Sequence, residues 1–331
     1  MTNANKKDNL NIKPDFSKEA LATRAGYGET LVELVERGAD IMAVDADLSS
    51  STTTAKLGNA YPERLVNVGI AEQNMIDIAA GLSLTGKTVF TSSFAAFGTG
   101  RCYDQIRNTI CYASLNVKVA PTHAGITVGP DGGSHQMLED ISLMRGLPGM
   151  RVLVPADYWS AKRAIELAAN TPGPFYIRLG RSKLPQIYDE NTKFELGESK
   201  ALRSGDDVTI VAVGVEVIQA LEAADILQET HNISVEVIDA FSVKPFDKKT
   251  LLESVQKTGC VVTCEEHSTV GGLGSAVGAI IGENFPVPLE RVGIRDQFGT
   301  SGEPDELLCE YNLDACGIVA KATQAIQRKN T

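Results

Sequence analysis

Residues 64–91, RLVNVGIAEQNMIDIAAGLSLTGKTVFT, decide the fold, because they predict a strand, a helix and a second strand in succession. The two strands are expected at 64–68 and 88–91, and the helix at 72–84. Strands that alternate with helices form mainly parallel sheets with helices on both faces. This segment therefore predicts an α/β protein.

The alternation continues on both sides of this segment. Before it we expect a helix at 18–37 and a strand at 41–45. After it the pattern predicts helices at 99–113, 137–145 and 157–170, and strands at 117–120, 151–154 and 175–179. A second alternating set follows, with strands at 208–213, 234–238, 259–264 and 289–292 and helices at 216–229, 248–257, 274–281 and 313–327.

Between the two sets, a charged segment containing Pro185, Gly197 and Gly205 has only weak periodicity and is typical of a linker. The predicted fold class is α/β with two doubly wound domains, the first built on a parallel sheet and the second on a mostly parallel sheet. The expected organisation is a flexible tail, a first domain, a linker and a second domain, at residues 1–17, 18–184, 185–206 and 207–331 respectively.

Composition excludes several classes of protein. The chain of 331 residues carries a formal net charge of -11, which argues against nucleic acid as a partner. No apolar run is long enough to cross a bilayer, and the polar start leads into no signal-peptide core, so we expect no membrane partner and a cytoplasmic protein. The six cysteines have no zinc-ligand spacing, and reduced, mostly buried thiols are expected.

Ligands of doubly wound proteins bind beyond the carboxyl ends of the strands, so the residues there are candidates for a site. Glu72 stands between a predicted strand and its helix. It either complements the helix dipole or acts as a buried carboxyl that exchanges a proton with a heterocycle nitrogen. Phe94 and Phe97 are either core residues or faces on which a flat heteroaromatic ring stacks.

The loop from Thr122 to Gln136 contains four glycines, a carboxylate and two of the four histidines of the chain. His123 and His135 are suited to bind hydroxyls or to move protons near neutral pH, together with Asp131. No ligand spacing supports a metal here. Among the residues at 175–181, Arg178 and Arg181 follow a strand, where arginine is well placed to bind phosphate.

Two further patterns have less specific interpretations. The glycine-rich stretch 271–278 is similar to a dinucleotide loop, but its spacing favours glycines that allow close packing of a helix on the sheet. His231 and His267 are expected to be structural or exposed.

Several motifs in one order resemble the carboxyl-terminal half of the transketolase family, namely its pyrimidine-binding domain followed by its C-terminal domain. The resemblance covers nearly all of residues 18–328, and its motifs are GIAEQ at 69–73, FAAF at 94–97, TH at 122–123, DGGSHQ at 131–136, LPGM at 147–150, VPAD at 154–157 and RSKLP at 181–185.

The resemblance implies thiamine diphosphate as cofactor. Glu72 would hydrogen-bond the aminopyrimidine, Phe94 and Phe97 would surround that ring, and Asp47 would lie on the thiazolium side. Asp131 and His135 match residues near the reacting hydroxyls of the substrate. The positions that match contacts to the sugar-phosphate tail are His123, Ser51 and Arg181.

The family's diphosphate and metal motif, Asp-Gly followed by Asn, has no counterpart in the sequence. The resemblance therefore implies one subunit of a split transketolase, completed by an amino-terminal-half subunit in an α2β2 assembly. That partner would hold most of the ligands of Mg²⁺ or Ca²⁺, and phosphorylated sugars would be the substrates. Gly100, where many members carry an aromatic residue, and the Ser/Thr run at 49–54 depart from the family pattern.

Other enzymes resemble the same half of the family. A 1-deoxyxylulose-5-phosphate synthase usually carries Arg-Ala where this chain has Thr122-His123, and the β subunit of 2-oxo-acid dehydrogenases lacks the pattern from Asp131 to His135. A non-catalytic α/β module that binds a partner or a nucleotide is the alternative outside these enzymes. The retained acid and histidine residues favour transketolase, transferring a two-carbon ketol unit from a ketose phosphate to an aldose phosphate.

Overall fold

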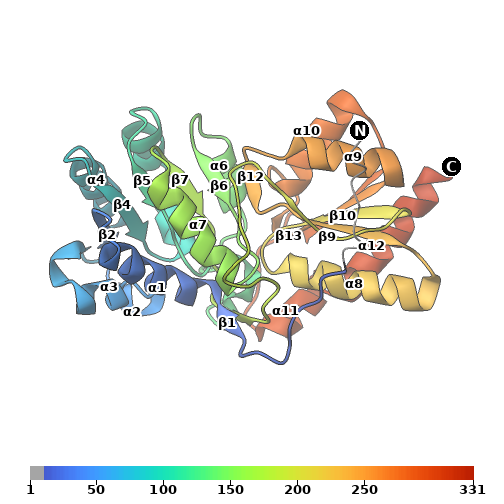
Figure 1. Cartoon of the computed structure of the whole chain (residues 1–331), viewed down its shortest axis with the longest axis horizontal. Helices are drawn as coiled ribbons and strands as arrows, with labels where there is room; N and C mark the ends of the chain where they lie inside the picture. The colour runs from blue at the N-terminus through green and yellow to red at the C-terminus, as the bar shows by residue number, and fades with distance from the viewer. Residues whose placement is uncertain (1–10) are drawn as a thin grey trace, which may run out of the picture.

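A computed structural model describes residues 11–331, which form two lobes side by side (Figure 1). The first lobe is built on a seven-stranded sheet in the order β12-β6-β7-β5-β4-β2-β3. Its strands are β12 (Ser242–Lys244), β6 (Arg151–Leu153), β7 (Phe175–Ile177), β5 (Val117–Val119), β4 (Thr88–Ser92), β2 (Ile41–Asp45) and β3 (Leu65–Asn67). All neighbours pair in parallel except β12, which is antiparallel to β6.

Helices cover both faces of this sheet, because strands that are apolar on both sides must be buried on both sides. The helical segments are α1 (Thr23–Glu36), α2 (Ser49–Thr52), α3 (Ala55–Ala60), η1 (Pro62–Arg64), α4 (Glu72–Ser83), η2 (Ala96–Arg101), α5 (Tyr103–Gln105), η3 (Ile106–Cys111), η4 (Ile126–Val128), α6 (Asp140–Arg145) and α7 (Tyr158–Asn170). α1 packs on α7 and α3, whereas α4 packs on β4 and η3. The segments η2 and η3 are π-helical, and such wide turns are frequent at functional sites.

The second lobe has a five-stranded sheet in the order β14-β13-β10-β11-β9. Its strands are β14 (Leu289–Ile294), β13 (Val261–Ser268), β10 (Val208–Ala212), β11 (Val235–Asp239) and β9 (Lys200–Arg203), of which only β9 is antiparallel to its neighbour. The helices are α8 (Glu216–His231), α9 (Lys248–Thr258), α10 (Leu273–Asn284), α11 (Pro304–Glu310) and α12 (Ala315–Lys329). α8 and α12 pack together, and α9 and α10 lie on the opposite side of the sheet (Figure 1).

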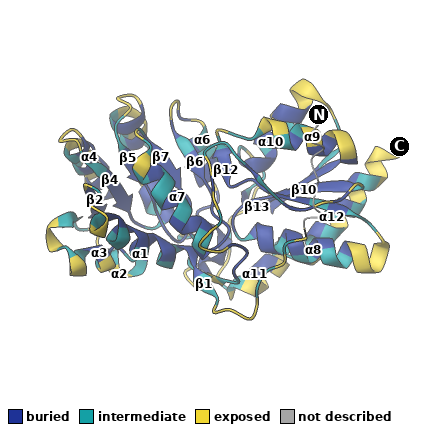
Figure 2. Cartoon of the chain, in the orientation of Figure 1, coloured by how far each residue is buried: buried dark blue, intermediate teal, exposed yellow. Residues whose placement is uncertain are grey.

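The two lobes share their cores. Each of the two large apolar clusters contains residues of both lobes, for example Leu31 with Leu221 in one and Ile76 with Val277 in the other. Strand β12 follows the second lobe's β11 in sequence but joins the first lobe's sheet. Burial is correspondingly continuous from one lobe to the other (Figure 2).

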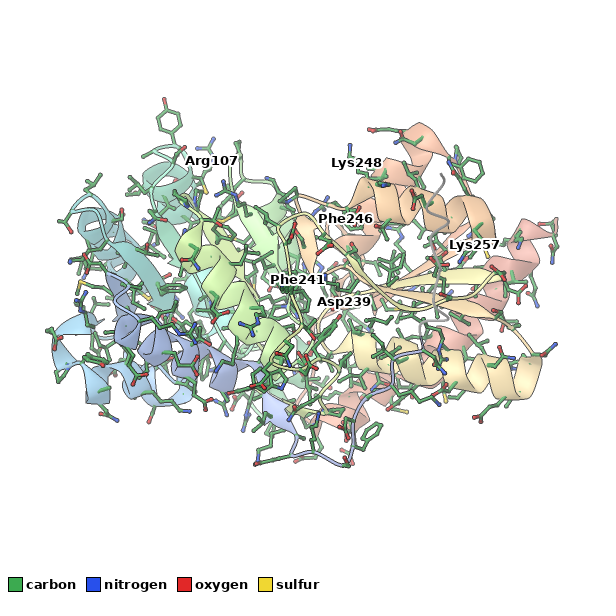
Figure 3. All side chains as sticks on the ribbon, viewed as in Figure 1. Arg107, Asp239, Phe241, Phe246, Lys248 and Lys257 are labelled. Atoms are coloured by element: carbon green, nitrogen blue, oxygen red, sulfur yellow. The ribbon has the colours of Figure 1, made fainter. Side chains whose placement is uncertain are left out.

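The expected linker is more ordered than its weak periodicity predicted. Its last part forms the edge strand β9, and the short strand β8 (Lys183–Leu184) before it pairs with β1 (Leu21–Ala22). Tyr188 donates a hydrogen bond to Asp239 at 2.7 Å, and the ring of Phe194 lies 4.5 Å from that of Phe241. Asp239 and Phe241 lie where the lobes meet (Figure 3).

The expected flexible tail includes residues 1–10, which lie outside the described residues. The part that follows, from residue 11, contacts the rest of the chain through backbone hydrogen bonds. The N–H of Ile12 donates to Leu202, and that of Asp15 donates to Gln186. These contacts connect the chain before α1 to the segment between the lobes, a pairing that no local pattern reveals.

The predicted fold class is confirmed, since both sheets are dominated by parallel pairs and both carry helices on their two faces. All six cysteines fall within the described residues and are free, and all but Cys309 and Cys316 are buried, which agrees with the expected reduced, mostly buried thiols. Among the described residues, no helix combines the length and the apolarity needed to cross a membrane.

Candidate active site

Glu72 begins α4, directly after the chain leaves the edge strand β3. Although it opens a helix, its side chain is only 3% exposed, so it differs from an ordinary surface charge at a helix start. A buried carboxylate is stable only with a partner that supplies charge or hydrogen bonds. The structure provides that partner from the π-helical segment η2.

Arg101 is the partner of Glu72. Its guanidinium donates a hydrogen bond to Glu72 Oε1 at 2.8 Å and lies over the ring of Phe97, 4.4 Å from the ring centroid. A flat group that stacks on Phe97 and donates an N–H to Glu72 has the shape and the bonding of an aminopyrimidine. The residues present therefore fit the pyrimidine of the implied cofactor, for which Arg101 is a stand-in.

Aromatic rings connect this carboxylate to the glycine-rich loop. Phe94 stacks on Phe97 with centroids 6.2 Å apart and on His123 with centroids 3.8 Å apart. The ring of His135 meets Phe97 edge-on at 5.2 Å. The structure thus brings five of the predicted residues, Glu72 included, into one continuous group.

Asp131 lies beside Arg181 at the rim of this group. Their side chains form an ion pair at 3.5 Å and are each about 40% exposed, so the pair is open to solvent. Arg181 also donates to the carbonyl of Val128 at 2.8 Å, which joins its position to that of the loop. Its guanidinium is therefore close to the loop and still accessible to a ligand.

His123 is held as a neutral imidazole. Arg24 donates to His123 Nε2 at 3.3 Å, so Nδ1 carries the hydrogen and donates it to the hydroxyl of Thr122 at 2.7 Å. Burial is the main cause that lowers the pKa of His123, and together with the charges of Arg24, Arg181 and His135 it brings this pKa to about 3. His123 therefore stays neutral near pH 7 and can contact a ligand without taking up a proton.

This pKa predicts a dependence of stability on pH. In the unfolded chain His123 binds a proton near pH 6.5, whereas in the folded chain it does so only near pH 3. Between these values the unfolded state holds the extra proton, so the free energy of unfolding falls as the pH falls from 6.5, by up to about 1.4 kcal/mol per pH unit. We expect the free energy of unfolding of His123→Gln, measured by denaturant titrations between pH 4 and 6.5, to depend less steeply on pH than that of the native chain.

A matched control is His231→Gln, because His231 is exposed at the end of α8. That variant should keep the native slope. Equal slopes for the native chain and His123→Gln would contradict the buried neutral state of His123.

The loop after β2 is organised by a carboxylate that sequence inspection did not single out. Asp45 is fully buried and accepts hydrogen bonds from the hydroxyls of Thr52 and Thr54 at 2.7 and 2.9 Å. The unusual Ser/Thr run is therefore explained in part by the internal partners of Asp45. The Ser/Thr run also places the carbonyl of Ser51 so that this oxygen accepts a hydrogen bond from Arg24 at 2.8 Å.

Asp47 lies farther out on the same loop. It is exposed, has a left-handed backbone with φ of 65°, and receives a hydrogen bond from the amide of Asn67 at 3.5 Å. The structure shows no contact between Asp47 and the aromatic group. Its predicted place beside the cofactor's thiazolium ring stays a prediction.

Two features outside this group have structural explanations. Arg178 is 6% exposed and pairs with Asp140 of its own lobe and with Glu266 of the second lobe, so it is not free for phosphate. The carboxylate of Glu265 accepts from the N–H groups of Leu273 and Gly274, and a Cβ on Gly272 would lie 2.0 Å from it. The carboxylate of Glu265 therefore occupies the place at this glycine-rich turn where a dinucleotide loop would bind the phosphates of its ligand. This confirms that the glycines allow close packing of the helix on the sheet.

The two remaining histidines follow their expectations. His267 is fully buried, between the carbonyl of Ser268 at 2.6 Å and the N–H of Ser142 at 3.3 Å. His231 is exposed. Within residues 11–331, His, Cys, Asp and Glu side chains form no group of three or more arranged to hold a metal ion.

Comparison with known proteins agrees with this geometry. Residues 19–186 match the family description "Transketolase, pyrimidine binding domain", and residues 197–318 match "Transketolase, C-terminal domain". The chain belongs to the transketolase family. It corresponds to the carboxyl-terminal section of that family, which depends on thiamine diphosphate.

Among the transketolase relatives, the putative transketolase C-terminal section of Methanocaldococcus jannaschii is 47% identical over 92% of this chain and 96% of its own. A 6-deoxy-6-sulfo-D-fructose transketolase subunit of Clostridium sp. is 44% identical over 93% and 95%. A solved structure described as a split gene transketolase, inactive β4 tetramer, is 48% identical, covers 94% of this chain and 99% of its own, and superposes with a TM-score of 0.86.

Two arginines of the site were missed in the sequence. Arg24 lies in a helix that was considered only for its apolar spacing, and Arg101 lies between Gly100 and Cys102 in the expected helix 99–113. Both are charged residues next to small or apolar neighbours. That signal is weak, because most such arginines are solvated.

Proposed function

We propose that this chain is the carboxyl-terminal subunit of a thiamine-diphosphate-dependent transketolase that moves a two-carbon ketol unit from a ketose phosphate to an aldose phosphate. The contact between Glu72 and Arg101 carries the proposal. A buried carboxylate that already holds a flat N–H donor over an aromatic ring is suited to an aminopyrimidine. Membership of the transketolase family supports the same reaction class.

When bound, thiamine diphosphate supplies the thiazolium carbon that carries the two-carbon unit. Glu72 holds and moves a proton at its carboxylate, next to the pyrimidine. Phe94 and Phe97 orient the flat ring by stacking. Binding of the pyrimidine requires the guanidinium of Arg101 to leave Glu72, because both groups need the same carboxylate oxygen and the same ring.

Arg24, His123 and Arg181 would bind the anionic end of the sugar. Two guanidinium groups beside a neutral imidazole form a cationic cluster, which suits phosphate. Asp131 and His135 would contact the hydroxyls nearer the reacting carbon, and Ser51 would complete the tail site. One relative is named for a sulfonated sugar, so experiment must decide whether the anionic group of the sugar bound here is a phosphate or a sulfonate.

A separate subunit would complete this site. We propose that it supplies the diphosphate-binding half with Mg²⁺ or Ca²⁺, in an α2β2 assembly. Ile70, two residues before the buried Glu72, is 79% exposed and would then face the partner. The solved relative described as an inactive β4 tetramer supports a β chain that needs a partner for activity.

Reconstitution tests the proposal directly. The chain mixed with an amino-terminal-half transketolase subunit from the same organism, thiamine diphosphate and Mg²⁺ should transfer a two-carbon unit from a ketose phosphate to an aldose phosphate. Each subunit alone should show activity at background. Consumption of pyruvate without ketol transfer would instead assign the chain to the synthase or dehydrogenase alternatives.

A further inference from the structure

Glu266 reaches from the second lobe into the glycine-rich loop of the first. It lies near the end of β13, is 4% exposed, and accepts a hydrogen bond from the N–H of Thr127 through Oε1. The loop approaches this carboxylate closely. Gly125 has φ of +85°, and a Cβ there would lie 2.2 Å from the carboxylate carbon. The carboxylate therefore packs directly on the loop backbone.

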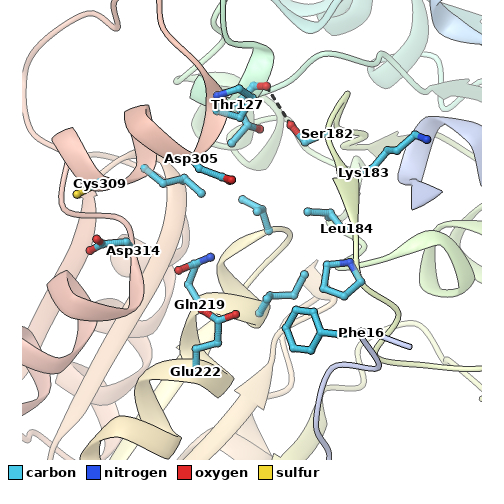
Figure 4. Close-up of a pocket in the computed structure, with 15 residues that line it drawn as sticks. Phe16, Thr127, Ser182, Lys183, Leu184, Gln219, Glu222, Asp305, Cys309 and Asp314 are labelled. Carbon is cyan, nitrogen blue, oxygen red and sulfur yellow. Dashed lines mark hydrogen bonds between the residues drawn. The ribbon is translucent and has the colours of Figure 1, made fainter. Parts of the chain in front are cut away.

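The other peptide group of Thr127 is also fixed. Its carbonyl accepts a hydrogen bond from the hydroxyl of Ser182 at 3.2 Å, drawn as the dashed line in Figure 4. Both residues line a crevice of about 400 Å³ between the lobes, on whose other walls Gln219 and Asp305 lie. The segment around Thr127 is thus bound on both sides of its backbone.

A second anchor lies at the far end of the loop. Gln136 donates through Nε2 to the carbonyls of Ile126, Gly129 and Thr300, at 3.1, 3.3 and 2.8 Å. Ser301 donates its hydroxyl hydrogen to the carbonyl of Pro130 at 2.5 Å. Residues of the second lobe therefore fix the loop before and after Asp131 and His135.

The charge of Glu266 is balanced by a residue of the first lobe. Arg178 lies 3.5 Å from Glu266 Oε2 and donates to the Glu266 carbonyl at 2.8 Å, while its Nε donates to Asp140 at 2.8 Å. Burial raises the pKa of Glu266, and Arg178 opposes that rise. This chain of contacts makes the position of the loop depend on how the two lobes meet.

We propose that Glu266 and Gln136 are positioning residues, through which the C-terminal domain holds the loop Thr122–Gln136 so that His123, Asp131 and His135 face the sugar. The inference rests on the proposed function for its catalytic consequence. It gives the second lobe a part in the reaction although none of its side chains belongs to the proposed site. The two anchors lie on either side of the loop's tip, so loosening either one releases the same residues.

Glu265 offers a matched control. It is the adjacent residue of the same strand, is also fully buried and also accepts backbone N–H bonds, but it caps α10 and makes no hydrogen bond to the loop. Glu266→Gln and Glu265→Gln each remove one buried charge and keep the side-chain volume. Gln136→Met tests the second anchor without changing any charge.

Hydrogen exchange of the full chain is the first measurement. Glu266→Gln and Gln136→Met should each accelerate exchange of the amides between residues 124 and 136 by about tenfold, whereas Glu265→Gln should accelerate exchange at the start of α10 instead. This readout needs no activity, so it separates failure of the inference from failure of the proposed function. Unchanged exchange of the loop in both variants, or equal acceleration in Glu265→Gln, would overturn the proposal.

Kinetics of the complex reconstituted with the partner subunit are the second measurement. Glu266→Gln and Gln136→Met should raise KM for the sugars by about tenfold and leave the binding of thiamine diphosphate, followed by calorimetry, unchanged. Glu265→Gln should retain native KM values even if its melting temperature falls. A parallel loss of melting temperature and of kcat in all three variants, with KM constant, would show a merely structural role and overturn the proposal.

Discussion

Glu72→Gln should lower kcat of the reconstituted enzyme by about 10³-fold, within the range usual for loss of a positioned proton donor or acceptor. Glutamine keeps the size of the side chain and one oxygen that accepts from Arg101. It removes the group that takes up and releases a proton beside the pyrimidine. Assembly with the partner subunit, measured by sedimentation, should be unchanged, because Glu72 is only 3% exposed and offers the partner little surface.

Arg101→Met is the control that separates chemistry from structure. It removes the ion pair with Glu72 but keeps the carboxylate. If loss of the ion pair caused the defect of Glu72→Gln, Arg101→Met would lose as much activity. We expect Arg101→Met to retain most of kcat, and turnover near the native value in Glu72→Gln would refute the role of Glu72.

The central strands were predictable from sequence, as were the edge strands β3 and β14, whereas the edge strands β9 and β12 were not. Val208–Ala212 is apolar except for Thr209 and is buried at every position, so its pattern alone identifies it. β9 and β12 are four and three residues long, and each pairs at the edge of its sheet. Such short strands form because they pair with a neighbouring strand that is distant in sequence, and the local sequence pattern contains no information about that partner.

The same distinction applies to the site. The place of Glu72 at the start of a helix follows from the alternation of strand and helix, and the structure adds that it is buried. Its contact with Arg101 depends on the π-helical turns of η2, which the expected regular helix at 99–113 did not include. The bond between Thr127 and Glu266 joins residues 139 positions apart, so only the packing of the lobes creates it.

Arg24→Met and Arg181→Met should each raise KM for a phosphorylated acceptor by roughly tenfold to a hundredfold, the value of one charge-assisted hydrogen bond. Their effect on an acceptor without phosphate should be small. The physical reason is that Arg24 donates to His123 at 3.3 Å, and the positive charges of both Arg24 and Arg181 act on that imidazole, whose pKa is lowered first by burial and then by these charges. Steady-state kinetics with matched phosphorylated and unphosphorylated aldoses measure the difference.

Arg37→Met is the matched control for Arg24→Met, since Arg37 directly follows the same helix but lies exposed at its far end, paired with Glu33 and Glu166. It should leave both KM values unchanged. Because Arg24 also holds His123 and the carbonyl of Ser51, its replacement could instead disturb the loop. In that case turnover of phosphorylated and unphosphorylated aldoses would fall equally, which would contradict a phosphate site.

A sulfonated ketose tested beside a ketose phosphate distinguishes sulfonate from phosphate as the anion that the site binds. If the native enzyme prefers the phosphate and both Arg24→Met and Arg181→Met abolish that preference, the cationic cluster of Arg24 and Arg181 binds the phosphate dianion.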